Sequence, residues 1–270
     1  MGKRHAIFVT NDDGIDSPGF LAALEGACPL GEVLAVAPVR QQTSMGRART
    51  GRPDACLEPR LLRILGAEFT AYALDASPAG VVGHALRVVP DYRPALLIAG
   101  INYGENIGVN VTGSGTVGAC LEAAAHGIPA LAVSLETPVE AHRAYVELDW
   151  AAAIHFLRYF ASVVLDKGLP PGVQILKVEV PAAATPETPW RMAALSRRLY
   201  YMTAIPNAGL QSPYGSRIVA KRDCGADAPG TDSYVLNVDK EVAVTPMTVD
   251  LTAYAGMEDA QYWFRNGSSA

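Results

Sequence analysis

The chain has 270 residues, of which 50% are hydrophobic, and this is enough to build one large core or a core with an extension. It carries 22 basic and 27 acidic residues with no block of five like charges, so nothing indicates a nucleic-acid surface or a polybasic membrane patch. No apolar run approaches the ~18 residues of a membrane-spanning helix. The four cysteines are widely spaced and form no CxxC pair, which predicts reduced thiols in a cytoplasmic protein.

Strand and helix signals alternate over the first 180 residues. Short apolar runs predict buried strands, and the Ser-Pro pairs that begin at Ser17 and Ser77 predict helix starts, because serine caps a helix and proline suits its first turn. The alternation predicts an α/β fold with a largely parallel sheet and flanking helices. Strands are expected at 5–9, 31–37, 69–74, 94–99, 130–135 and 174–180; helices are expected to start at Pro18 and Pro78 and to cover 116–126 and 139–166, and 47–66 should be loop with at most one edge strand.

The composition changes after Pro170-Pro171, and this marks the boundary between a core of residues 1–172 and a C-terminal region of residues 173–270. Beyond the strand expected at its start, this region is rich in proline and tyrosine, with strand-like runs at 217–222 and 233–244. Such a β-rich arm cannot bury its apolar side alone. We therefore expect one strand that completes the core, followed by an arm that packs on the core or on another subunit.

Two adjacent acids, Asp12 and Asp13, come directly after the first strand and before the helix that starts at Pro18. In an open α/β sheet, ligands bind at the edge where strands give way to helices. Two carboxylates in one crevice repel each other unless a cation lies between them. The stretch therefore predicts a divalent-metal site, although a solvated turn explains Asn, Asp and Gly equally well.

Two more loops are expected at the same sheet edge. The loop at 38–46 offers the hydroxyls of Thr43 and Ser44, and the loop at 100–116 offers Asn102 and Asn106. Oxygen donors dominate, and no cluster of His or Cys accompanies them. This set disfavours zinc and favours a hard cation such as Mg²⁺ or Mn²⁺.

The third loop is rich in glycine and runs through Ser114-Gly115-Thr116 into a predicted helix. Uncovered backbone amides and a helix N-terminus together form an anion site, although glycines also serve merely to permit a tight loop. The loop lacks the lysine of a Walker motif and the GxGxxG spacing of dinucleotide folds. A metal site facing an anion site is the layout for phosphate chemistry.

At this point the chain resembles the SurE (survival protein E) family of metal-dependent nucleotidases. The resemblance rests on Thr10-Asn11-Asp12-Asp13-Gly14 with Ser17-Pro18-Gly19, on the Gly100-Ile101-Asn102-x-Gly104-x-Asn106-x-Gly108 stretch, and on Ser114-Gly115-Thr116-Val117-Gly118-Ala119. It implies a Rossmann-like core, a C-terminal arm exchanged between subunits of a homodimer or homotetramer, and hydrolysis of nucleoside monophosphates.

The resemblance also implies roles for single residues. The metal ligands would be Asp12, Asp13, Thr43 and Asn102, and the phosphate would be held by Asn106, Ser114, Gly115 and Thr116. Three positions depart from the family pattern: Thr43 replaces a usual serine, and Gly80 and Asn110 each replace a usual aspartate.

The expected mechanism has a metal-activated water attack the phosphoryl group while one of the two acids, favouring Asp13, accepts the proton. Covalent attack by an aspartate stays open as a second route. An aspartyl-phosphate phosphatase would need DxD spacing, which Asp12-Asp13 lacks. Two further functions fit the same residues, namely a non-catalytic nucleotide or phosphate sensor with the same fold and a broad acid phosphatase that also cleaves short polyphosphate.

Overall fold

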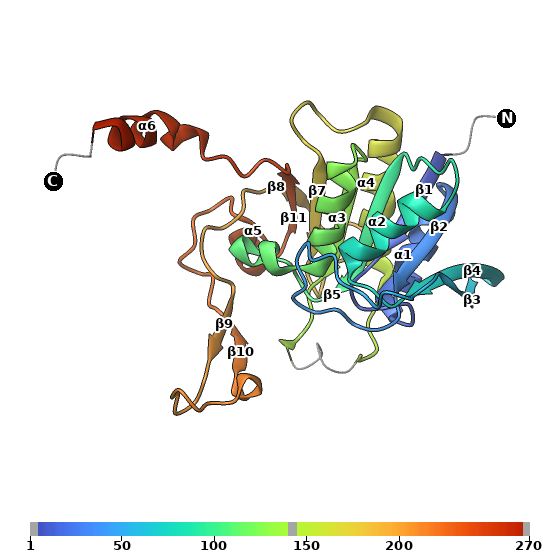
Figure 1. Cartoon of the computed structure of the whole chain (residues 1–270), viewed down its shortest axis with the longest axis horizontal. Helices are drawn as coiled ribbons and strands as arrows, with labels where there is room; N and C mark the ends of the chain where they lie inside the picture. The colour runs from blue at the N-terminus through green and yellow to red at the C-terminus, as the bar shows by residue number, and fades with distance from the viewer. Residues whose placement is uncertain (1–4, 140–144, 267–270) are drawn as a thin grey trace.

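The computed structural model describes residues 5–139 and 145–266. Its centre is a nine-stranded sheet (Figure 1). Across the sheet the strands follow the order β3 (Glu58–Ile64), β4 (Ala67–Leu74), β2 (Gly31–Pro38), β1 (His5–Thr10), β5 (Leu96–Tyr103), β6 (Ala130–Leu135), β7 (Ile175–Val180), β11 (Val242–Met247) and β8 (Trp190–Met192).

All neighbouring strands from β4 to β7 are parallel. The antiparallel pairs lie toward the two sides of the sheet, where β3 pairs with β4 and β11 pairs with β7. Strand β8 is parallel to β11. The predicted α/β fold with a largely parallel sheet is therefore confirmed, and β3 is the edge strand allowed for within 47–66.

Helices cover both faces of the sheet. Ile7 and Val9 of β1 pack in one apolar cluster with α1 (Pro18–Ala27) and α4 (Ala151–Lys167). Phe8, between them in sequence, packs in a second cluster with α2 (Pro78–Val88) and α3 (Gly115–Ala125). Because side chains alternate along a strand, β1 contributes to both halves of the core, and this is why its run is continuously apolar.

Both Ser-Pro helix starts are confirmed. The Ser17 hydroxyl accepts a hydrogen bond from the Phe20 N–H at 3.1 Å, and α1 begins at Pro18. The Ser77 hydroxyl accepts from the Gly80 N–H at 3.3 Å, and α2 begins at Pro78. These caps satisfy amides at the helix ends that border the carboxyl edge of the sheet.

The helix predicted over 139–166 is wrong in its first part. Residues 145–150 are irregular and α4 starts at Ala151, while residues 140–144 lie outside the described ranges. Val146 exchanges two hydrogen bonds with the Tyr103 hydroxyl, at 2.6 and 2.9 Å, and the Asp149 carboxylate accepts from the Ala151 N–H at 2.9 Å. Tertiary bonds therefore override a helical periodicity in the sequence.

Two further boundaries differ from the prediction. Strand β5 continues to Tyr103, where a loop was expected, with a break in its register against β6 between Ala99 and Asn102. The strand-like run at 233–244 is helical in its first half, as α5 (Asp232–Tyr234) and a π-helical turn, η4 (Val235–Asp239). Val235 and Leu236 are adjacent in sequence and both fully buried. In a strand they would point to opposite faces, whereas a helical turn here buries both.

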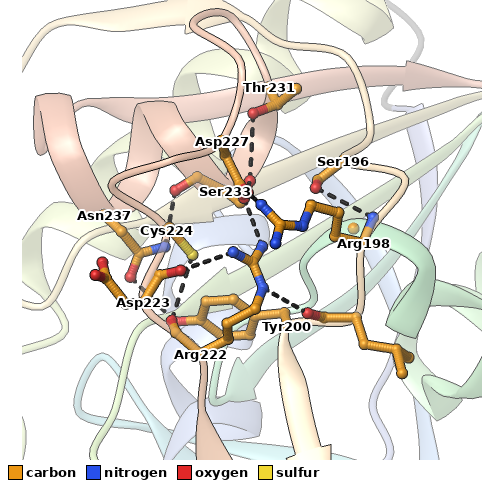
Figure 2. A network of polar contacts seen from close by, with 12 residues as sticks. Ser196, Arg198, Tyr200, Arg222, Asp223, Cys224, Asp227, Thr231, Ser233 and Asn237 are labelled. Carbon is orange, nitrogen blue, oxygen red and sulfur yellow. Dashed lines mark hydrogen bonds and ion pairs between the residues drawn. The ribbon is translucent and has the colours of Figure 1, made fainter.

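The C-terminal region leaves the core as two projections (Figure 1). One is a hairpin of β9 (Tyr201–Ala204), which was not predicted, and β10 (Ile218–Lys221), which lies within the predicted run at 217–222. At its root Asp227 accepts from Arg198 at 3.1 Å and from Arg222 at 2.6 Å, as Figure 2 shows. The other projection ends in α6 (Met257–Asn266). None of the described helices has the length and apolar character needed to cross a membrane.

Candidate active site

Three loops meet at the carboxyl edge of the central strands. The carbonyl of Asp12, after β1, accepts from the Gln42 N–H at 2.7 Å, and Gln42 follows β2. The Gly46 N–H at the end of that second loop donates to the Gly113 carbonyl at 2.9 Å, in the loop after β5. The structure thus brings together the three segments that the sequence placed at one edge.

Asp12 faces the first turn of α3. Its carboxylate accepts from the Thr116 hydroxyl at 2.5 Å. Burial raises its pKa, while the Thr116 hydroxyl and the nearby backbone amides of Gly115 and Thr116 lower it in part. A Cβ on Gly115 would lie 2.7 Å from the Asp12 Cβ, so only glycine allows this approach.

Asp13 is held from the other side. Its carboxylate accepts from the Tyr103 N–H at 2.9 Å and from the Gln41 side-chain amide at 3.2 Å. Burial first, and then the charge of Asp12, raise its pKa. No Lys, Arg or His within the described ranges forms an ion pair with either acid. Two buried neighbouring carboxylates without a cationic side chain are chemically suited to bind a metal ion.

Asn102 lies at the break in β5. Its side-chain NH₂ donates to the Gly104 carbonyl, and this leaves its carbonyl oxygen as the atom available to a ligand. The close approach of the neighbouring strand fixes the chain here, since a Cβ on Gly100 would meet the Val133 carbonyl oxygen at 2.3 Å. Asn102 therefore offers the neutral oxygen that the sequence predicted.

Thr43 is placed less favourably. It is exposed in the loop after β2 and, over the described residues, shares no hydrogen bond with Asp12, Asp13 or Asn102. The loop is anchored on both sides of it, at Gln42 and at Gly46. Thr43 thus lies in a turn that is bound on both sides, and in the described residues no hydrogen bond fixes its hydroxyl next to the two carboxylates.

These donors fit a hard cation. Two carboxylates, one amide oxygen and one hydroxyl are all oxygen ligands, and such ligands suit Mg²⁺ or Mn²⁺. The described residues contain no group of three or more His, Cys, Asp or Glu that could hold a metal ion, so an ion here would depend on two acids and on neutral oxygen donors. The remaining coordination positions would fall to water and substrate.

The first turn of α3 supplies the anion side of the site. The Ser114 hydroxyl caps the helix by accepting from the Val117 N–H at 3.1 Å, and this leaves the earlier amides, of Gly115 and Thr116, at the open end of the helix. A Cβ on Gly118 would lie 1.9 Å from the Gly46 carbonyl oxygen, so the loop after β2 presses directly on α3. Backbone amides and helix dipole together favour a bound phosphate beside Asp12.

Asn106 is fixed by buried polar groups. Its N–H donates to the Glu179 carboxylate at 2.8 Å, its carbonyl accepts from the Lys177 ammonium at 2.8 Å, and its side-chain NH₂ donates to the Ser134 hydroxyl at 3.1 Å. One hydrogen of that NH₂ is left for another acceptor. This arrangement presents Asn106 as a rigid donor.

Sequence reasoning missed the cluster beneath Asn106, which we call the Lys177 cluster: Lys177, Glu179 and Asp232. All three are fully buried, and the Lys177 ammonium lies 3.1 Å from Asp232 and 3.5 Å from Glu179. Asp232 also accepts from the backbone amides of Gly108 and Ser196, each at 2.9 Å. Two charged residues within the apolar run Ile-Leu-Lys-Val-Glu-Val were the available signal.

Comparison with known proteins identifies the family. The sequence profile described as Survival protein SurE matches residues 7–202. A protein of Thermococcus kodakarensis named 5′-nucleotidase SurE is 40% identical over 258 residues, which cover 94% of this chain and 96% of that protein. The chain belongs to the SurE family.

Further SurE proteins agree with this assignment. One from Methanocella arvoryzae, also named 5′-nucleotidase SurE, is 40% identical over 256 residues, covering 92% of this chain and 94% of that protein. The crystal structure of the SurE protein from Aquifex aeolicus superimposes with a TM-score of 0.76 at 27% identity, covering 96% of this chain and 99% of that one. This SurE chain therefore matches its relatives over nearly its whole length.

Two of the residues that the sequence analysis set apart from the family pattern, Asn110 and Gly80, have close structural neighbours. The Asn110 side-chain oxygen accepts from the amides of Tyr200 and Tyr201, at 2.7 and 3.1 Å, and so braces the C-terminal region against the glycine-rich loop. A Cβ on Gly80 would lie 3.0 Å from the Ser77 hydroxyl that caps α2. Neither residue contacts the paired acids through a hydrogen bond in the described part of the chain.

We predict that Gly115→Ala weakens binding of a divalent cation by about tenfold or more, because the new methyl group displaces the Asp12 carboxylate. Calorimetric titration with Mn²⁺ measures this. Gly113→Ala is the matched control, since a Cβ there meets nothing within 4 Å. Equal affinities of the two variants would contradict the close approach of α3 to Asp12.

We predict that Glu179→Gln changes how stability depends on pH. Burial raises the pKa of Glu179 from 4.5 to about 7, so the folded protein binds this proton more tightly than the unfolded chain does. The resulting contribution to the free energy of unfolding is lost as pH rises through this window. The difference in unfolding free energy between the variant and the wild type should therefore shift in favour of the variant from pH 4.5 to pH 7. Urea unfolding at a series of pH values measures this, and a constant difference would contradict it.

Proposed function

We propose that this SurE protein is a divalent-metal-dependent 5′-nucleotidase that hydrolyses nucleoside monophosphates to nucleoside and phosphate. The observation that carries the proposal is the pair of buried acids, Asp12 and Asp13, facing the amides at the start of α3. The names of its relatives from Thermococcus kodakarensis and Methanocella arvoryzae support the same activity.

Asp12, Asp13 and Asn102 would hold Mg²⁺ or Mn²⁺, with Thr43 as the fourth protein ligand. When bound, such an ion supplies a water of lowered pKa and polarises a phosphoryl oxygen. Since both carboxylates are buried and carry raised pKa values, they keep their negative charges most easily when a cation is next to them.

Asp13 is the better proton acceptor of the two acids. Asp12 accepts a short hydrogen bond from the Thr116 hydroxyl, at 2.5 Å, and this lowers its basicity while leaving lone pairs for a metal ion. Asp13 accepts at one oxygen from the Tyr103 amide and at the other only through the longer bond from Gln41, at 3.2 Å. That second oxygen is the atom we assign to take the proton from the attacking water.

The phosphate is assigned to the residues around the start of α3. The amides of Gly115 and Thr116 and the NH₂ of Asn106 donate to phosphate oxygens, with Ser114 holding the helix end in place. Their hydrogen bonds strengthen as negative charge builds on the transferring phosphoryl group, and this stabilises the transition state. No arginine or lysine is assigned to this step.

We also propose how the protein is organised. Residues 1–172 form the catalytic core, and residues 173–270 add β7, β8 and β11 to its sheet and carry the two projections, which form the arm through which copies of the chain assemble into a dimer or tetramer. Exposed apolar side chains on the two projections support the arm: Met202, Ile218, Tyr262, Trp263 and Phe264. All four cysteines are free thiols, and this suits the reducing cytoplasm.

We predict that Asp13→Asn lowers kcat for phosphate release from nucleoside monophosphates by at least about a hundredfold, because the amide cannot accept the proton. Asp16→Asn, at an exposed position of the same turn, should keep most of the activity. A chelator should abolish wild-type turnover, and added Mg²⁺ or Mn²⁺ should restore it. Unchanged turnover of Asp13→Asn in metal-replete buffer would refute the role of Asp13.

We predict that Ile218→Glu or Trp263→Glu lowers the mass of the particle in solution, since a charge on an apolar contact disfavours assembly. Light scattering coupled to gel filtration measures this. The control is Leu61→Glu on edge strand β3. Leu61 is also an exposed apolar residue, at 67%, but it lies in residues 1–172 and not on either projection. A monomeric wild type, or an equal effect of all three substitutions, would refute assembly through the arm.

A further inference from the structure

An exposed aromatic ring borders the paired acids. Tyr145 belongs to the irregular segment before α4, and its hydroxyl donates to the backbone carbonyl of Asp13 at 2.8 Å. Despite this bond, 43% of the residue is exposed. Asp13 therefore links two features, because its carboxylate belongs to the proposed metal site and its carbonyl holds the tyrosine.

Tyr145 is held in place by a buried neighbour. Its ring meets the ring of Tyr103 edge-on, with centroids 5.2 Å apart, and Tyr103 is only 4% exposed. The Tyr103 hydroxyl in turn binds both backbone groups of Val146, at 2.6 and 2.9 Å, and its N–H binds the Asp13 carboxylate. Since the edge-on contact with Tyr103 and the bond to Asp13 hold Tyr145 in place while much of it stays exposed, the ring needs little ordering to receive a partner.

The chemistry of Tyr145 determines what kind of group can bind there. The residue offers an aromatic ring and no charge, and its hydroxyl is already bonded to the Asp13 carbonyl. In the proposed function the phosphate is placed by the metal ion and by the amides at the start of α3. The part of a substrate that lies against Tyr145 is therefore its uncharged, flat part.

We infer that Tyr145 forms the subsite for the base of the nucleotide, whose flat face stacks on the exposed face of the tyrosine while the phosphate lies at the start of α3. This inference rests on the proposed nucleotidase function. An aromatic ring accepts any base, so the subsite selects nucleotides over phosphate esters without a ring. Tyr145 is thus a specificity-determining residue and takes no part in proton transfer.

The test compares two substrates that differ only in the base: adenosine 5′-monophosphate and ribose 5-phosphate. Tyr145→Ala should raise KM for adenosine 5′-monophosphate by about tenfold, with kcat nearly unchanged, because base stacking on an aromatic side chain has this magnitude. The kinetic constants for ribose 5-phosphate should stay within about twofold. Tyr145→Phe, which keeps the ring but not the bond to Asp13, should behave like the wild type with both substrates.

Tyr159→Ala is the matched control. Tyr159 is 44% exposed and also has an edge-on ring neighbour, Phe160, but it lies on α4 and has no bond to the site. It should change neither KM. If Tyr145→Ala impairs both substrates alike, Tyr145 acts only through the position of Asp13, and the base subsite is refuted; the subsite is equally refuted if neither substrate is affected.

A binding measurement separates this inference from the proposed function. Adenosine carries no phosphate, so it is titrated calorimetrically into the wild type and into Tyr145→Ala in the presence of a chelator. Binding to the wild type that weakens about tenfold in the variant supports the subsite even if the protein hydrolyses no nucleotide. Equal binding to both proteins, or none to the wild type, refutes the subsite and leaves the nucleotidase proposal standing on the turnover of adenosine 5′-monophosphate.

Discussion

Two negative charges buried side by side are the constraint around which this molecule is built. Asp12 and Asp13 are 8% and 6% exposed, and neither has a cationic side chain as its partner in the described structure. A buried carboxylate is costly unless hydrogen bonds or a cation favour its charged form. The Thr116 hydroxyl supplies such a hydrogen bond to Asp12, and the Tyr103 amide supplies one to Asp13. The close approach explains the glycine at position 115, because a Cβ there would lie 2.7 Å from the Asp12 Cβ.

Much of the fold could be predicted from the sequence because its signals are local. The Ser-Pro helix starts at Ser17 and Ser77 and the apolar strands need only neighbouring residues to be recognised. The parts that could not be predicted depend on partners far along the chain. Residues 145–150 have a helical periodicity, but the hydroxyl of Tyr103 holds Val146 in another conformation. No local pattern contains that information.

The same distinction holds for the candidate site. The acids and the glycine-rich loop could be predicted because strand ends in a parallel sheet share one edge. Tyr145 was interpreted as part of a helix face, and the structure places it against Asp13 instead. Lys177 and Glu179 were visible as charges in an apolar strand, but their partner Asp232 is 55 residues beyond Lys177, and its relevance appears only in the fold.

The Lys177 cluster shows that the C-terminal region is part of the construction of the site. Asn106 is proposed to donate a hydrogen bond to the phosphate. Its N–H is bound by Glu179 and its carbonyl by Lys177, and both of these residues lie on β7. Asp232 binds Lys177 and the amide of Gly108, so it fixes the same loop from the far side. Removing one member of such a buried group leaves another charge unpaired, and this is far more destabilising than losing a surface ion pair. A change of position in the segment that carries Asp232 would therefore reach Asn106 through Lys177 and through the loop at Gly108.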